Sequence, residues 1–331
     1  MKDATAAIVA LALTLGPLAA AAQTAPAASA NEPDVAYAAY QRGHYLAAFR
    51  EATRRVEQKS DPKSMTLLAE LYADGLGVAN DDKKAADWYK LAAARGDREA
   101  IFALSMFRMT GRGGPTDRNE AVRLMTDAAN RGHVVAAYDL ALLYLEGQTV
   151  PQDFKRAAEL LRRPADAGNP QAQYALATLY KEGRGVTKDL EEAARLLGLA
   201  ARADYTDAEV EYAIALFNGL GVPKNESAAG AYFLKAARKG SAPAQTRLAR
   251  MYATGRGIKA DPVEAGRWHL IALAGGINDQ FLEDFMRSMK PLDRSMAENK
   301  AKPWIARMNP IGPTPFPTAP PHQTKSQPVK P

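Results

Sequence analysis

The residues with the most obvious chemical potential stand in the segment "LYKEGRGVTKDLEEA", which runs from Leu179 to Ala193. Gly183 and Gly185 lie there between a hydrophobic run and a helical pattern that begins at Asp189. Glycine-rich loops that precede a helix often bind phosphate, because their backbone N–H groups point at the ligand. A single G-x-G is a weak signal, so the segment alone leaves two alternatives: a nucleotide site, or a turn between two helices.

Two other patterns could support catalysis or metal binding. Ser60 and Lys63 form an S-x-x-K motif, the nucleophile motif of some penicillin-interacting enzymes, but no partner motif accompanies it. The histidines lie far apart without the spacing of metal ligands, and the chain has no cysteine for a zinc site. We therefore expect no catalytic residues, no metal and no cofactor. The four histidines are His44, His133, His269 and His322.

The charge of the chain gives no indication of a nucleic-acid partner. Among its 331 residues, Lys and Arg number 43 and Asp and Glu 37, which leaves a net charge of +6. These charges are dispersed, and no basic run is interleaved with aromatic residues as in a nucleic-acid surface. We expect no nucleic-acid binding.

The N-terminal residues have the pattern of a secretory signal peptide. Lys2 precedes an apolar segment at about residues 6–15, and Ala20-Ala21-Ala22 forms a small-residue cleavage site before Gln23. The alternative is an uncleaved membrane anchor, but Gly16-Pro17 interrupts the run, which is short for a bilayer. We expect a signal peptide at residues 1–22, a flexible linker at 23–33, and a periplasmic or secreted protein with no membrane span after cleavage.

A 36-residue period changes the interpretation of the glycine loop. The first glycine recurs at Gly75, Gly111, Gly147, Gly183, Gly219 and Gly255. The second recurs at Gly77, Gly113, Gly185, Gly221 and Gly257, with Thr149 as the exception. A fixed period of this length is typical of a solenoid of stacked helical or strand-containing units.

Each repeat has the pattern of two helices joined by the glycine turn. In the fourth repeat, Leu176, Leu179 and Tyr180 form an apolar stripe at helical spacing. Gly183 then ends the first helix, and Asp189 begins the second with Glu192 at the capping-box distance. The loop is therefore predicted to be a turn rather than a phosphate site.

The pattern A-x-x-x-L-A-x-x-Y-x-x-G-x-G-V-x-x-D-x-x-x-A resembles the Sel-1-like repeat, a relative of the tetratricopeptide repeat, over residues 64–276 in six copies. The resemblance implies an all-α fold, a right-handed α-solenoid. It also implies a bacterial secreted or periplasmic protein that is not catalytic and that acts as an adaptor or regulator in envelope signalling, export or exopolysaccharide control. The alternative is a cell-wall- or β-lactam-active enzyme, since a cysteine-rich branch of the family has been linked to β-lactam binding.

The segments that flank the repeats differ from them. Residues 34–63 are predicted to form an N-terminal tetratricopeptide-like helix pair, and residues 277–308 helices that cap the last repeat. Residues 309–331 are rich in proline and are predicted to be a disordered tail.

The candidate site is a surface rather than a cluster of reactive groups. By resemblance to tetratricopeptide units, the first helices line the concave face, and their inward positions form an apolar groove with polar or basic walls beyond it. Such a groove suits a protein or peptide partner bound by a monomer. The alternative is that curvature buries these side chains between repeats. The predicted groove residues are Phe102, Met106, Met109, Tyr138, Leu142, Leu145, Tyr174, Lys181 and Phe217.

Overall fold

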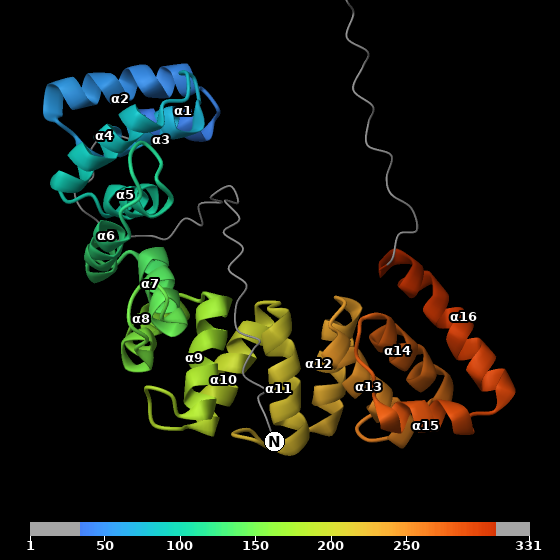
Figure 1. Cartoon of the computed structure of the whole chain (residues 1–331). Helices are drawn as coiled ribbons and strands as arrows, with labels where there is room; N and C mark the ends of the chain where they lie inside the picture. Colours follow the sequence, from blue (N-terminus) through green and yellow to red (C-terminus); the bar gives the residue numbers. More distant parts are fainter. Residues whose placement is uncertain (1–33, 309–331) are drawn as a thin grey trace, which may run out of the picture.

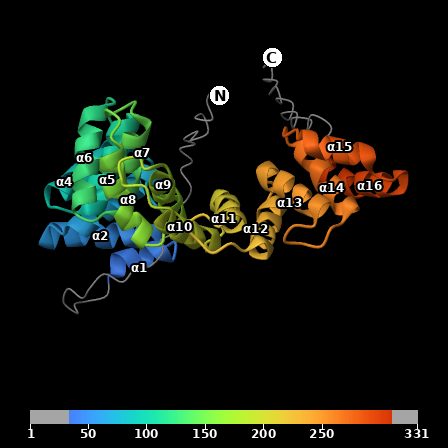
Figure 2. The ribbon, with the colours of Figure 1, turned by 90° about the horizontal axis from the view of Figure 1, so that it is seen from below.

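The computed structural model describes residues 34–308, which form sixteen α-helices and no strand. Figure 1 shows the helices following one another along an open arc, with α1 at one end and α16 at the other. Figure 2 shows the same succession from below, where α11 to α16 continue away from the group formed by α1 to α10. The predicted all-α solenoid is confirmed. The predicted signal peptide, linker and proline-rich tail lie outside the described residues.

The six repeats have uniform helices of 13 residues. The first helix of the first repeat begins at Pro62, two residues before the start that the periodicity suggested. The first helices are α3 (Pro62–Asp74), α5 (Arg98–Thr110), α7 (Val134–Glu146), α9 (Pro170–Glu182), α11 (Thr206–Asn218) and α13 (Ala242–Thr254). The second helices are α4 (Asp82–Ala94), α6 (Arg118–Asn130), α8 (Phe154–Asp166), α10 (Leu190–Arg202), α12 (Glu226–Arg238) and α14 (Pro262–Ala274).

Capping residues set the ends of these helices as the sequence predicts. Gly183 follows α9 with φ +73°, a left-handed conformation that glycine adopts at little cost. The Asp189 carboxylate then accepts hydrogen bonds from the N–H groups of Glu191 and Glu192 at 3.0 Å, which satisfies donors at the start of α10. The carboxyl groups that open the second helices are therefore used for capping and not for acid–base chemistry.

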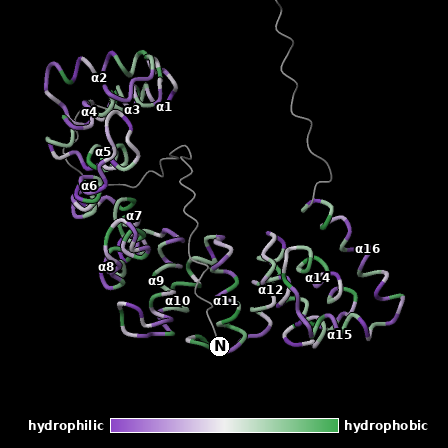
Figure 3. Tube along the Cα trace, in the orientation of Figure 1, coloured by the Kyte–Doolittle hydropathy of each residue, from purple (hydrophilic) through white to green (hydrophobic). Residues whose placement is uncertain are grey.

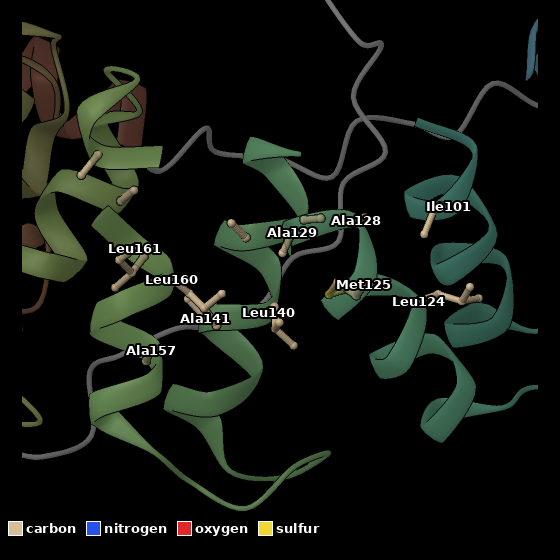
Figure 4. Packing of buried hydrophobic residues seen from close by; sticks show 14 of the residues in the cluster. Ile101, Leu124, Met125, Ala128, Ala129, Leu140, Ala141, Ala157, Leu160 and Leu161 are labelled. Carbon is tan, nitrogen blue, oxygen red and sulfur yellow. The ribbon is translucent and has the colours of Figure 1, made fainter. Parts of the chain in front are cut away.

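Small side chains let neighbouring helices approach closely. Ala141 and Ala177 are completely buried, and their counterparts in other repeats are equally buried. Figure 4 shows Leu140 and Ala141 of α7 between Met125 of α6 and Leu161 of α8. Figure 3 shows hydrophobic and hydrophilic residues mixed along the helices, as expected when each unit buries one stripe against its neighbours.

The second glycine of each turn approaches the preceding repeat. A Cβ atom at Gly185 would overlap the backbone carbonyl of Phe154 and the amide of Lys155, at the start of α8. Gly113, Gly221 and Gly257 approach the starts of α4, α10 and α12 in the same way. Only glycine permits this contact, because any side chain would occupy the space of the neighbouring backbone. The G-x-G turn thus joins consecutive repeats.

Extra helices cover both ends of the repeat array. At one end α1 (Val35–Gln41) and α2 (Tyr45–Lys59) bury Ala48 and Ala52 against Leu68 and Leu71 of α3. At the other end α15 (Gln280–Ser288) and α16 (Pro291–Met308) follow α14. There the rings of Trp268 and Trp304 meet edge to face, 5.7 Å apart. These helices cover the apolar surfaces that the terminal repeats of an open solenoid would otherwise expose.

Candidate functional site

Aromatic side chains connect some of the first helices to the start of the next first helix. The ring of Phe102 lies 4.4 Å from that of His133, and the ring of Tyr174 lies 5.3 Å from that of Tyr205. Each pair joins the middle of one first helix to the residue just before the next one. We call the surface that carries the nine predicted groove residues, together with the matching positions of α3 and α13, the first-helix face.

All nine predicted groove residues are partly exposed, and none is fully buried or fully exposed. Most of the apolar groove residues pack against the hydrophobic core with part of their side chain. Met109 and Leu142 are partly exposed without being among the side chains that pack against the core clusters in the described part of the chain. The side chains in contact with a core cluster are Phe102, Met106, Tyr138, Leu145, Tyr174 and Phe217.

Lys181 is the single predicted groove residue with a charge, and it has a partner within the chain. Its Nζ donates to Oε2 of Glu211 on α11 at 2.9 Å. Further along, the guanidinium of Arg250 on α13 forms two bonds, of 2.7 and 2.9 Å, to the carboxylate of Asp279 just before α15. Lys181 is thus paired across consecutive repeats, and Arg250 is paired with the segment that follows the last repeat.

The first three repeats carry acidic groups on this face that the groove prediction did not select. The pKa of Glu70 is raised to about 7, first by burial and then by the nearby carboxylates of Asp74, Glu99 and Asp97. The pKa of Asp139 is raised to about 6 by burial, against an opposing effect of His133. Asp139 directly follows Tyr138, so a wider choice of inward helix positions would have included it.

His133 contributes to the structure through both ring nitrogens. Nδ1 accepts a hydrogen bond from the N–H of Ala136 at 3.0 Å and caps α7. Nε2 therefore carries the proton and donates to Oε2 of Glu99 at 2.8 Å, which lowers the pKa of that carboxyl. The expectation that this histidine is packed or solvated, rather than a metal ligand, fits this arrangement. In residues 34–308 no group of three His, Cys, Asp or Glu side chains could hold a metal ion.

The S-x-x-K motif lies at the junction of two helices. Ser60 follows α2 in a left-handed conformation with φ +48° and is exposed. Asp61 caps α3 and accepts hydrogen bonds from the backbone N and the Oγ of Ser64, at 3.0 and 2.6 Å. The residues of the motif therefore end one helix and begin another.

The glycine loop of the fourth repeat uses its backbone donors internally. The N–H groups of Gly183 and Arg184 both donate to the carbonyl of Leu179, at 2.8 and 3.1 Å. The N–H of Asp189 donates to the carbonyl of Tyr180 at 3.0 Å. A cavity of about 420 Å³ lies beside the loop, but both cations and carboxylates line it, among them Lys155, Glu159 and Asp189. The geometry favours the turn and not the nucleotide site.

Comparison with protein families agrees with this repeat geometry. The Sel1 repeat model matches six consecutive segments, at residues 62–97, 98–133, 134–169, 170–205, 206–241 and 242–277. The chain belongs to the Sel1 repeat family. These segments coincide with the six helix pairs from α3 to α14. Sel1 repeat solenoids are generally protein-interaction scaffolds and typically lack catalytic activity.

Solved structures of Sel1 repeat proteins have the same fold. One is a Sel1 repeat protein from Oxalobacter formigenes, with 26% identity and a TM-score of 0.58 over 73% of this chain and 97% of the other. Another is a protective antigen of uropathogenic Escherichia coli with an SLR fold. It has 24% identity and a TM-score of 0.56, over 87% of this chain and 72% of the other. No curated protein matches the sequence.

None of the helices within residues 34–308 of this Sel1 repeat protein has the length and apolar character needed to span a membrane.

Proposed function

We propose that this Sel1 repeat protein is a non-catalytic periplasmic scaffold that binds a protein or peptide partner on the first-helix face. It acts as a monomer, in an adaptor or regulatory role in envelope signalling, export or exopolysaccharide control. The periplasmic assignment depends on the signal-peptide pattern of residues 1–22.

The observation that carries the proposal is the position of Met109 and Leu142. Both are apolar and partly exposed, and they lie on adjacent first helices outside the core clusters. Partly exposed apolar side chains on neighbouring elements of one surface favour contact with a partner. Methionine in particular adapts to ligands of different shape, because its side chain is flexible and polarizable.

The experiment is partner capture from envelope extracts with the mature protein, residues 23–331. We expect Met109→Ser combined with Leu142→Ser to reduce the captured partner by at least about tenfold, since two partly buried apolar contacts contribute roughly 1–3 kcal/mol. Leu91→Ser is the matched control, because Leu91 is 44% exposed but lies on the second helix α4.

Circular dichroism and thermal melting establish that the variants remain folded. The proposal is wrong if the doubly substituted protein keeps its helical spectrum and still captures the same partner in the same amount. It is also wrong if Leu91→Ser reduces capture equally, because the binding surface would then include the second helices.

A further inference from the structure

Two ion pairs of the C-terminal half of the molecule have no counterpart in the N-terminal half, where other residues stand at the same places. In one of them Arg250 of α13 binds Asp279, 29 residues later. Arg250 is equivalent to Glu70, 180 residues earlier, and Asp279, the N-cap of α15, corresponds to Asp97, the N-cap of α5, so that two carboxylates stand where the C-terminal end has an arginine and an aspartate. Asp97 accepts hydrogen bonds from the N–H of Ala100 and the hydroxyl of Thr66, whereas the charges that act most on Glu70 are all carboxylates.

The second ion pair shows the same difference. In the fourth and fifth repeats Lys181 of α9 binds Glu211 of α11 at 2.9 Å. The equivalent residues 72 positions earlier are Met109 and Asp139. The carboxylate is retained, but methionine replaces the lysine that would neutralise it.

From these two missing cations we infer that the first-helix face of repeats one to three binds an extended segment carrying lysine or arginine side chains on either side of an apolar residue. One cation of the partner lies beside Glu70, in the position that the Arg250 side chain has in the last repeat. The other lies beside Asp139, in the position that the Lys181 side chain has in the fourth repeat. The apolar residue contacts Met109 and Leu142. This inference rests on the proposed function, because it specifies the partner of the same face.

The electrostatics of this face agree with this partner. The pKa values of Glu70 and Asp139 are raised to about 7 and about 6, first by burial; the carboxylates nearby raise that of Glu70 further, and His133 only partly opposes the effect on Asp139. A bound lysine or arginine would restore the charged form of both groups. It would also relieve the repulsion between Glu70 and its neighbours Asp74 and Glu99.

The spacing of the two carboxylates sets the length of the partner segment. They lie on α3 and α7, two repeats apart. Each first helix packs on the second helices beside it, and a stacking distance of about 10 Å per repeat, the width of one packed helix, places the two carboxylates roughly 20 Å from each other. An extended chain rises about 3.3 Å per residue, so the two cations should be about six residues apart.

The test uses fluorescent synthetic peptides and the mature full chain. The first probe carries two lysines about six residues apart with a leucine midway, in a serine- and proline-containing chain that stays extended. The second probe replaces both lysines by glutamate. Anisotropy is measured at ~0.05 and ~0.3 M salt, because binding through partly exposed charges weakens as salt screens them. We expect the lysine probe to bind, and to bind at least about tenfold more tightly than the glutamate probe.

Two variants supply the missing cations from within the chain. Glu70→Arg places a cation near Asp97 and Glu99, as Arg250 stands beside Asp279, and Met109→Lys places one at the position equivalent to Lys181, which binds Glu211. We expect both variants to melt at or above the wild-type temperature, yet to bind the lysine probe at least about tenfold more weakly. Glu191→Arg makes the same charge change on the exposed surface of α10 and should leave binding unchanged.

The outcomes separate this inference from the proposed function. Failure of the lysine probe to bind, equal binding of both probes, or unchanged binding by Glu70→Arg and Met109→Lys overturns the inference. If the doubly substituted Met109→Ser, Leu142→Ser protein loses the captured partner while Glu70→Arg still binds it normally, the proposed function stands. The inference that the partner segment is cationic is then wrong. Loss of the captured partner in Glu70→Arg and Met109→Lys, with Glu191→Arg unaffected, supports both.

Discussion

The guanidinium of Arg184 lies over the ring of Phe154, with its central carbon 3.8 Å from the ring centre. Arg184 is the middle residue of the G-x-G turn in the fourth repeat, and Phe154 is the first residue of α8 in the third. The same pair of positions joins Arg112 to Asp82 through bonds of 3.1 and 2.6 Å, and Arg256 to Glu226 at 2.5 Å. The side chain between the glycines therefore links one repeat to the one before it.

Arg184→Ala and Phe154→Ala are each expected to destabilise the protein, and their effects are not expected to add. A cation over an aromatic ring at a partly exposed site contributes about 0.5–1 kcal/mol, so the double variant should lose less than the sum of the single variants by about that amount. Urea unfolding of the wild type, the two single variants and the double variant measures the coupling. Arg202→Ala on α10 is the control. Strict additivity would show that the stacking contributes nothing to stability.

Gly185→Ala should cost far more than an alanine at another left-handed glycine. Gly168 has φ +86°, and no atom lies within 4 Å of the place that a Cβ would take. Gly168→Ala should therefore lower the stability only through the left-handed conformation, by about 1–2 kcal/mol. At Gly185, with φ +71°, the new Cβ would also overlap the backbone of Phe154 and Lys155, which adds about 1–3 kcal/mol. Thermal and urea unfolding of the two variants compares these costs. Equal losses of stability would mean that the contact between Gly185 and the start of α8 adjusts to a side chain without cost.

Glu209 replaces a glutamine that the neighbouring repeats use to join two helices. Gln173 and Gln245 donate to the carbonyls of Ala165 and Ala237, at 3.0 and 3.1 Å. Glu209 is completely buried and cannot donate in its charged form. Instead its Oε1 accepts bonds from Lys235 and Lys239, at 2.9 and 2.7 Å.

We expect Glu209→Gln to cost no more than about 1 kcal/mol, because glutamine can donate to the carbonyl of Ala201, as its counterparts donate to Ala165 and Ala237. Lys235 and the N–H of Asp204 contact the Ala201 carbonyl only at 3.4 and 3.3 Å. Glu209→Ala should cost about 3 kcal/mol, because it leaves a cavity and two lysines without their buried partner. Urea unfolding distinguishes the two. A larger loss for Glu209→Gln than for Glu209→Ala would show that the ion pairs, and not the geometry of the amide position, stabilise this junction.

Glu70→Gln is expected to change how stability depends on pH. The pKa of Glu70 is about 7 in the folded protein against 4.5 for an unperturbed glutamate, so the folded state holds its proton more tightly than the unfolded chain. The stabilisation from this proton is complete below pH 4.5 and is lost as the pH rises through 7. Glu70→Gln should therefore stabilise the protein at pH 8 by on the order of 1 kcal/mol and have little effect at pH 4.5.

Thermal melts of the wild type and Glu70→Gln across this pH range test the prediction. A stability difference that stays constant with pH would contradict it. The groups that influence Glu70, or are influenced by it, come from four helices or their caps and contain no cation: Tyr40, Asp74, Tyr89, Asp97 and Glu99.

Local features of the sequence predicted most of the fold because the interactions behind them are local. A glycine that ends a helix and an aspartate that caps the next act within a few residues, and their 36-residue recurrence gave the number and order of the helix pairs. The choice of groove residues followed from the resemblance to tetratricopeptide units, which implied that the first helices line the concave face, and from helical spacing along those helices. The acidic groups Glu70 and Asp139 were not selected, because their significance depends on which residue of the next repeat each one meets.

The sequence by itself determined the repeat architecture, the helix ends and the absence of cysteine chemistry, because composition and period contain this information directly. Only the tertiary structure decided which side chains meet across repeats. The packing of consecutive helices brings together residues about 30 positions apart, such as Lys181 with Glu211 and Arg184 with Phe154. That packing also gathers the carboxylates of Asp74, Glu99 and Asp97 around Glu70, because burial and pairing depend on the neighbours in space and not on the residue type alone.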